Sequence, residues 1–254
     1  MLDFNHREKF HDKLNALIDT ALEAERQGAW KRDYLGGSRL GVECKRALQY
    51  EYTHIPKDED RDFDGQSLRI FAAGHLFEEL AIEWLRKAGF ELFTEKQNGK
   101  QFGFRVAGGR IAGHVDGIIN NAPESLGMTF PALWECKSMN NKNWKETEKK
   151  GLLISKPVYA AQVAVYQAYM EGTVTGISQN PALFTAVNKD TAEIYHELVP
   201  FDAALAQSMS DKGVQVIQAC EAGELLPRIS TTPSFFGCKF CPYQDRCWGE
   251  TDGR

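Results

Sequence analysis

RIAGHVDGII at residues 110–119 and PALWECKS at residues 131–138 decide the fold of this chain. Both are short β-prone runs, and the turn-prone segment NNAPESLG lies between them. We therefore expect two neighbouring strands. Successive side chains of a strand point to opposite faces, so Glu135 and Lys137 share one face and Cys136 faces the other.

This pairing of strands brings three charged residues together. Asp116 ends the apolar part of the first run, and Glu135 and Lys137 stand on the second. Two carboxylates are costly to bury side by side unless a cation lies between them, and their hard oxygen atoms suit Mg²⁺ or Mn²⁺. Such a cation lowers the pKa of a bound water, while Lys137 holds that water or stabilises charge on a phosphate. A simple salt bridge across two strands would leave the same pattern.

Two helical segments carry further side chains suited to this chemistry. FAAGHLFEEL, at residues 71–80, places His75 and Glu78 three apart on one helical face. An imidazole there could complete a site that tolerates manganese. AAQVAVYQAY, at residues 160–169, places Gln162 and Tyr166 four apart on one face of a mostly apolar helix.

Three cysteines crowd the stretch FFGCKFCPYQDRCW at residues 235–248, and a fourth lies far upstream. These four are Cys44, Cys238, Cys241 and Cys247. Four thiolates hold either Zn²⁺ or an iron–sulfur cluster, and the spacing alone leaves both open. The remaining two, Cys136 and Cys220, are expected to be buried apolar residues.

The charge of the chain is uneven. The 254 residues carry a net charge of −5, which does not indicate a nucleic-acid binder. Between residues 137 and 156, however, six lysines face two glutamates, a local balance of 6 − 2 = +4. A phosphate backbone could lie there, although a solvated helix face has the same composition. Lys142 and Lys145 are our candidates for contact with DNA.

The location of the protein also follows from composition. The first ten residues are charged, and no apolar run reaches the ~18 residues of a membrane helix. We therefore expect a cytoplasmic protein without membrane contact. In a reducing compartment, cysteines are better read as metal ligands or apolar residues than as disulfides.

Helices are expected on both sides of the strands. Apolar periodicity predicts helices at residues 5–27, 67–88, 142–149, 158–170 and 202–222. Further strands are predicted in ELFTE, QFGFRV, ALFTAVNK and AEIYHELV. This order indicates an α/β fold with a central mixed sheet flanked by helices.

The candidate site residues, in their order along the chain, resemble the signature of the PD-(D/E)xK nucleases of the RecB and AddB clade. The matching residues are His75, Asp116, Glu135-x-Lys137 and Gln162-x-x-x-Tyr166. With the four cysteines, the chain resembles the iron–sulfur members, namely the AddB nuclease domain and the CRISPR-associated Cas-four exonucleases with their phage-borne relatives. The resemblance covers roughly residues 35–250.

The resemblance implies a role for each matching residue. It implies a restriction-endonuclease-like core in which Lys137 is the catalytic lysine and Gln162 and Tyr166 position the DNA. Mg²⁺ or Mn²⁺ would be held by His75, Asp116, Glu135 and the main-chain carbonyl of Cys136. The four cysteines would hold a [4Fe-4S] cluster that clasps the N- and C-terminal segments together. Two residues remain second-tier candidates, Glu78 and His114.

The implied activity is metal-dependent exonuclease cleavage of single-stranded DNA ends in recombination, repair or CRISPR adaptation. DNA and the proteins of such a pathway would be the partners, and homo-oligomers remain open. The alternatives are a DNA-binding scaffold with a silent nuclease site and a zinc-stapled endonuclease of the same fold. The implied domains are an N-terminal segment at 1–66, a nuclease core at 67–225 and a cysteine segment at 226–254.

Overall fold

The structure is a computed structural model that describes residues 9–249, and its strands form two sheets instead of the single sheet expected. A three-stranded sheet has the order β1-β4-β3, and a five-stranded sheet has the order β2-β5-β6-β7-β8. Both are mixed, because β1 and β4 pair in parallel, as do β6 and β7, and the other pairs are antiparallel. The strands are β1 Leu35–Gly36, β2 Glu91–Phe93, β3 Gly103–Val106, β4 Ile111–His114, β5 Gly117–Asn121, β6 Ala132–Met139, β7 Ala182–Asn188 and β8 Ile194–Val199.

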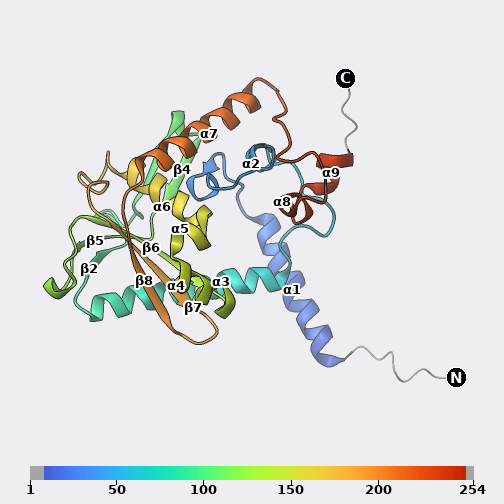
Figure 1. The fold of residues 1–254 in the computed structure, drawn as a ribbon. Helices are drawn as coiled ribbons and strands as arrows, with labels where there is room; N and C mark the ends of the chain where they lie inside the picture. The colour runs from blue at the N-terminus through green and yellow to red at the C-terminus, as the bar shows by residue number, and fades with distance from the viewer. Residues whose placement is uncertain (1–8, 250–254) are drawn as a thin grey trace.

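Helices flank the sheets, as the sequence predicted (Figure 1). They are α1 Phe10–Gly28, α2 Lys45–Tyr52, α3 Gly65–Lys87, α4 Asn141–Lys150, α5 Leu152–Ser155, α6 Pro157–Met170, α7 Ala203–Glu221, α8 Phe236–Lys239 and α9 Gln244–Gly249. Short 3-10 turns lie at Gly37–Arg39, Ala107–Gly109 and Glu124–Leu126. The predicted helix 5–27 begins in residues outside the described range.

Helix α3 covers one face of the five-stranded sheet. The side chain of Asp64 caps its first turn by accepting from the Ser67 amide at 2.8 Å, and Gly89 follows its end with a φ of +94°. Ala81 and Leu85 of α3 pack with alternate residues of β6, one of which is Cys136. The prediction that Cys136 is buried and apolar is therefore confirmed.

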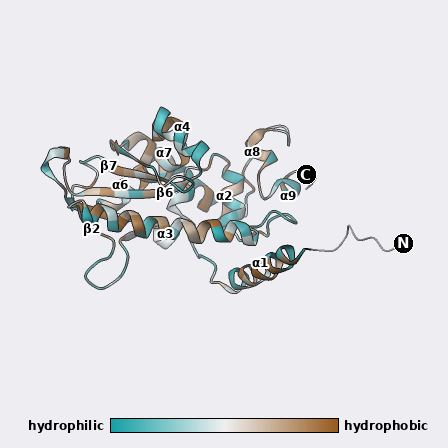
Figure 2. Cartoon of the chain, turned by 90° about the horizontal axis from the view of Figure 1, so that it is seen from below, coloured by the Kyte–Doolittle hydropathy of each residue, from teal (hydrophilic) through white to brown (hydrophobic). Residues whose placement is uncertain are grey.

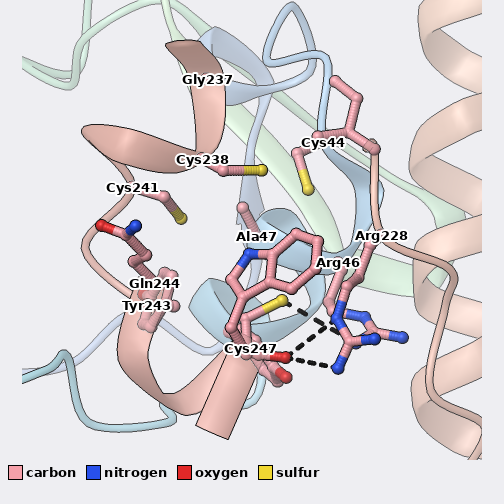
Figure 3. A pocket seen from close by; sticks show the side chains of 13 residues that line it. Cys44, Arg46, Ala47, Arg228, Gly237, Cys238, Cys241, Tyr243, Gln244 and Cys247 are labelled. Carbon is pink, nitrogen blue, oxygen red and sulfur yellow. Dashed lines mark hydrogen bonds between the residues drawn. The ribbon is translucent and has the colours of Figure 1, made fainter. Parts of the chain in front are cut away.

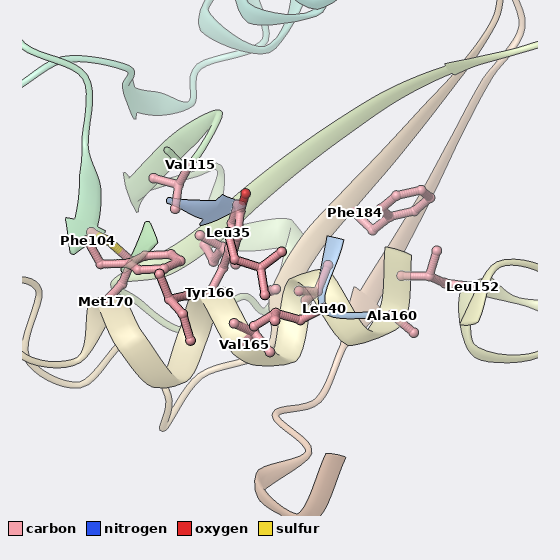
Figure 4. Packing of buried hydrophobic residues seen from close by; sticks show 14 of the residues in the cluster. Leu35, Leu40, Phe104, Val115, Leu152, Ala160, Val165, Tyr166, Met170 and Phe184 are labelled. Carbon is pink, nitrogen blue, oxygen red and sulfur yellow. The ribbon is translucent and has the colours of Figure 1, made fainter. Parts of the chain in front are cut away.

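The apolar helix α6 packs on the other side of β6. Its side chains form the larger core cluster with Leu133 and with Phe184 of β7. In Figure 4, Tyr166 of α6 lies against Phe104 of β3, with their ring centroids 5.2 Å apart in an edge-on arrangement. Helix α6 thus connects the five-stranded sheet to the smaller one. Figure 2 shows that apolar residues gather along these central strands and alternate with polar ones along α3.

The predicted strand 110–119 is in fact two strands that belong to different sheets. Strand β4 ends at His114, β5 begins at Gly117, and the chain bends through Val115 and Asp116 between them. Asp116 therefore lies at the point where the chain passes from one sheet to the other, and it shares no strand face with His114. The pairing of β5 with β6 confirms the expected neighbouring strands.

The N- and C-terminal segments lie side by side, with α2 close to α8 and α9 (Figure 1). Gln49 accepts from the Leu226 amide at 2.9 Å, and Asp58 accepts from the amides of Asp245 and Arg246 at 2.6 and 3.1 Å. These bonds connect the segments without any cysteine. No helix within residues 9–249 is long and apolar enough to cross a bilayer.

Candidate active site

Asp116, Glu135 and Lys137 meet where β5 and β6 lie side by side. The Lys137 ammonium donates to Glu135 Oε1 and, at 3.0 Å, to the main-chain oxygen of Cys136. It lies 3.8 Å from Asp116 Oδ2, which in turn accepts from the Cys136 amide at 2.8 Å. The structure thus brings together the three charged groups that the strand pattern predicted, and it holds them through the backbone of β6.

Glu135 is a buried carboxylate with one oxygen left without a partner. Its side chain is 0% exposed, and its Oε1 accepts from Gln162 Nε2 at 2.5 Å. Within the described residues, its Oε2 has no hydrogen-bond partner. Burial and the charge of Asp116 raise the pKa of Glu135 to about 8, although Lys137 opposes this shift. A buried carboxylate oxygen with free lone pairs is a natural ligand for a cation.

Helix α3 contributes Glu78 to this group. Burial, followed by the charge of Asp116, raises the pKa of Glu78 to about 7, and Lys137 opposes this shift. His75, the predicted ligand, is 79% exposed, and its Nδ1 lies 4.0 Å from Glu78 Oε2. Glu78 therefore faces the other carboxylates, whereas His75 lies at the rim beside Glu78. The sequence showed both on one helical face, but could not show which of them faces the strands.

The charges of the group suit a divalent cation. Three carboxylates and one ammonium sum to −3 + 1 = −2 when all are ionised. The charges of Glu135 and Asp116 raise the pKa of Lys137 despite its burial, so that this side chain stays positive. As the side chains stand in residues 9–249, no three His, Cys, Asp or Glu residues are gathered closely enough to hold a metal ion. The ammonium of Lys137 contacts oxygens of Glu135 and Cys136 that the family resemblance assigned to the metal.

Gln162 and Tyr166 lie behind the carboxylates. They are 6% and 3% exposed. Gln162 holds Glu135, and Tyr166 belongs to the core, where burial and the charge of Glu135 raise the pKa of its phenol. Gln162 is therefore placed to orient Glu135, whereas Tyr166 packs in the core, and the contact of both residues with DNA stays a prediction. His114 is exposed at the end of β4 and has no such contact with the carboxylates in the described structure.

Four of the six lysines between residues 137 and 156 lie on α4. Lys150 and Lys156 pair with Glu146 at 2.9 and 3.6 Å. The remaining lysines of this helix are exposed and form no ion pair with any residue in the range 9–249. They are Lys142, Lys145 and Lys149.

The four predicted cluster cysteines line one cavity between the terminal segments (Figure 3). Cys44 precedes α2, Cys238 lies in α8, Cys247 lies in α9, and Cys241 lies between these two short helices. Their sulfur atoms point toward a common space in Figure 3. Within residues 9–249, however, no three of these cysteines are gathered closely enough to hold a metal ion, and the iron–sulfur cluster stays a prediction.

Arg46 places a buried positive charge beside these cysteines. Its side chain is almost fully buried, donates to the Leu226 carbonyl at 2.5 Å, and lies 3.8 Å from the sulfur of Cys247. Arg228 donates twice to the Cys247 carbonyl, at 2.9 and 2.7 Å. A buried guanidinium requires negative charge nearby, which thiolates would supply. No role for Arg46 was predicted from the sequence. The only signal there is its position two residues after Cys44.

The raised pKa of Glu78 predicts a pH-dependent stability of the metal-free protein. Between the ordinary value of 4.5 and about 7, the folded state keeps a proton that the unfolded state has lost. The free energy of unfolding therefore falls as pH rises through this window, by at most about 3 kcal/mol. Urea unfolding in chelator should show a smaller fall for Glu78→Gln and an unchanged fall for Glu83→Gln, an exposed glutamate of the same helix. An equal fall in all three proteins would contradict this.

Comparison with known proteins identifies the fold. No family model and no curated protein matches the sequence. Among solved structures, an alkaline exonuclease (LHK-Exo) from Laribacter hongkongensis matches with a TM-score of 0.51 and 16% identity, over 78% of this chain and 93% of that one. The structure of LHK-Exo in complex with dAMP matches with a TM-score of 0.50 and 16% identity, over 75% and 89%. A structure of SSO0001 has a TM-score of 0.48 and 17% identity, over 96% and 100%.

At these identities the likeness to LHK-Exo concerns the fold alone. It confirms the expectation of a nuclease-like α/β fold for most of the chain. The narrower assignment to the RecB and AddB clade stays a prediction.

Proposed function

We propose that this protein is a metal-dependent DNA exonuclease that hydrolyses phosphodiester bonds at single-stranded ends. The observation that carries the proposal is the meeting of Asp116, Glu135 and Lys137 at one point between two strands. The fold supports it, because the matching structures include an alkaline exonuclease, one of them in complex with dAMP. In this proposal it acts in DNA recombination, repair or CRISPR adaptation.

The residues around Glu135 fit Mg²⁺ or Mn²⁺. Asp116, Glu135 and the Cys136 carbonyl would hold the ion, and α3 would add Glu78 or His75. When bound, the ion supplies a water of lowered pKa and charge stabilisation at a phosphoryl oxygen. Lys137 would then turn its ammonium from the carboxylates toward the attacking water and the phosphate. Gln162 keeps Glu135 oriented through its hydrogen bond.

Lysines of α4 would bind the DNA backbone. Lys142, Lys145 and Lys149 are exposed and unpaired within the described residues, so each can replace counterions on a phosphate. Helix α4 begins directly after β6, the strand that carries Glu135 and Lys137. A strand held by these lysines would therefore lie near the reacting group.

The four cysteines would hold a [4Fe-4S] cluster, with zinc as the alternative. The support is their place around one cavity, beside the buried charge of Arg46. The cluster would join the proposed domains at 1–66 and 226–254 across the core at 67–225. Its role in this proposal is structural.

An assay with end-labelled DNA tests the proposal. The anaerobically purified chain is incubated with single-stranded, blunt, overhanging and circular DNA, with Mg²⁺, Mn²⁺ or chelator. We expect metal-dependent shortening of linear single strands and little cleavage of circles. Binding without cleavage under every ion would instead favour a DNA-binding scaffold, and cleavage of circles would favour an endonuclease.

A further inference from the structure

The short helix α5 exposes two adjacent aliphatic side chains. Leu153 and Ile154 are 61% and 71% exposed, whereas Leu152 beside them is completely buried in the larger core cluster. Single exposed apolar residues are common on protein surfaces, whereas contiguous apolar patches mark interaction sites. The sequence analysis assigned no element to this segment.

Hydrogen bonds at both ends of α5 keep these side chains exposed. The Leu152 amide donates to Glu197 Oε2 at 2.8 Å, and this oxygen also accepts from the Tyr195 hydroxyl at 2.9 Å. At the other end of α5, the Ser155 hydroxyl donates to the Gly151 carbonyl at 2.7 Å. It also lies 3.0 Å from the hydroxyl of Thr147 on α4. With its backbone fixed at both ends, α5 presents Leu153 and Ile154 to the solvent in one orientation.

Helix α5 lies in the chain between α4, which carries the lysines, and α6, whose Tyr159 lies beside Lys137. The ammonium of Lys137 is 5.7 Å from the ring centroid of Tyr159, in the first turn of α6. Ile154 precedes Tyr159 by five residues, which span at most about 18 Å. This upper limit corresponds to about five base steps of DNA. A strand whose phosphates contact α4 and whose end reaches Lys137 would therefore pass close to α5.

We propose that Leu153 and Ile154 form a wedge that contacts the nucleobases of a DNA end and separates the terminal base pair. The inference rests on the proposed nuclease function and narrows its substrate to ends that are opened on this surface. The lysines of α4 favour a polyanion over a second protein as the occupant. Apolar side chains of this kind insert between base steps and unstack them.

Fluorescence of 2-aminopurine in the terminal base pair of a duplex reports this unstacking. The full chain is titrated into the duplex with Ca²⁺ replacing Mg²⁺ to suppress hydrolysis. The wild-type protein should raise the fluorescence on binding. The double variant Leu153→Ala/Ile154→Ala should bind about tenfold more weakly and cause no rise. Its cleavage of fully single-stranded DNA should remain.

The matched control is Ile194→Ala/Leu198→Ala on β8, which removes aliphatic side chains of 40% and 44% exposure. It should behave as the wild type. A wedge variant that keeps both affinity and fluorescence change overturns the inference, as does an equal loss in the control. A wild-type protein that cleaves DNA without raising the fluorescence overturns the wedge alone. One that neither binds nor cleaves DNA overturns the proposed function as well.

Discussion

Replacing Lys137 by methionine is expected to slow DNA cleavage by about 10²- to 10⁴-fold. Lys137 has the only ammonium among the described residues that touches Glu135, and it lies 3.8 Å from Asp116. Methionine keeps most of the side-chain volume and removes the charge that would stabilise the phosphate and hold the water. Initial rates on end-labelled single-stranded DNA, at saturating Mn²⁺, measure the effect.

Loss of activity must be separated from loss of the fold. Lys137→Met leaves Glu135 buried without its ammonium, which costs on the order of 3–5 kcal/mol where this carboxyl is ionised, that is, above its raised pKa of about 8. The double variant Glu135→Gln/Lys137→Met buries no charge in that pair and should regain stability without regaining cleavage. The control Lys150→Met removes an exposed lysine that pairs with Glu146 and should cleave as the wild type does. A stable Lys137→Met protein that cleaves within tenfold of wild type would remove Lys137 from the mechanism.

The sequence predicted β6, the strand that carries Glu135 and Lys137, because its signals are local. Side chains alternate between the two faces of any strand, so the shared face of Glu135 and Lys137 followed once residues 131–138 were predicted to be a strand. The strand 110–119 was predicted too long because β-branched residues stand on both sides of the break, although Asp116 and Gly117 themselves are uncommon in strands. Its break at Asp116 depends on tertiary structure, since Asp116 turns toward the Cys136 amide of another strand. No local pattern contains that contact.

The sequence predicted which residues make up the site better than it predicted how they are arranged. Gln162 and Tyr166 were identified by their helical spacing. That spacing shows that they share one face of the helix but not how deeply this face is buried, and both side chains proved to be buried. Likewise, the choice between His75 and Glu78 depends on how α3 crosses the sheet. Helix α5 escaped prediction because four residues are too few to show a helical period.

Cys241→Ala is expected to remove the iron and the brown colour of the anaerobically purified protein. Cys241 is one of the four cysteines around a single cavity, and a four-thiolate centre loses affinity when one ligand is missing. By the chain-entropy estimate, a link between residues this far apart contributes about 5 kcal/mol. Residues 226–249 should therefore become sensitive to protease. Iron content, the visible absorption spectrum and limited proteolysis measure these effects.

The matched control is Cys220→Ala, because Cys220 lies in α7 outside the cavity and should leave colour and iron unchanged. The bonds of Gln49 and Asp58 to the C-terminal segment persist in both variants, so Cys241→Ala should loosen that segment without unfolding the nuclease core. A colourless wild-type protein with stoichiometric zinc would replace the cluster by zinc. A wild-type protein with neither metal, and with the same protease resistance as Cys241→Ala, would show that the two segments are joined without a metal centre, through hydrogen bonds such as these.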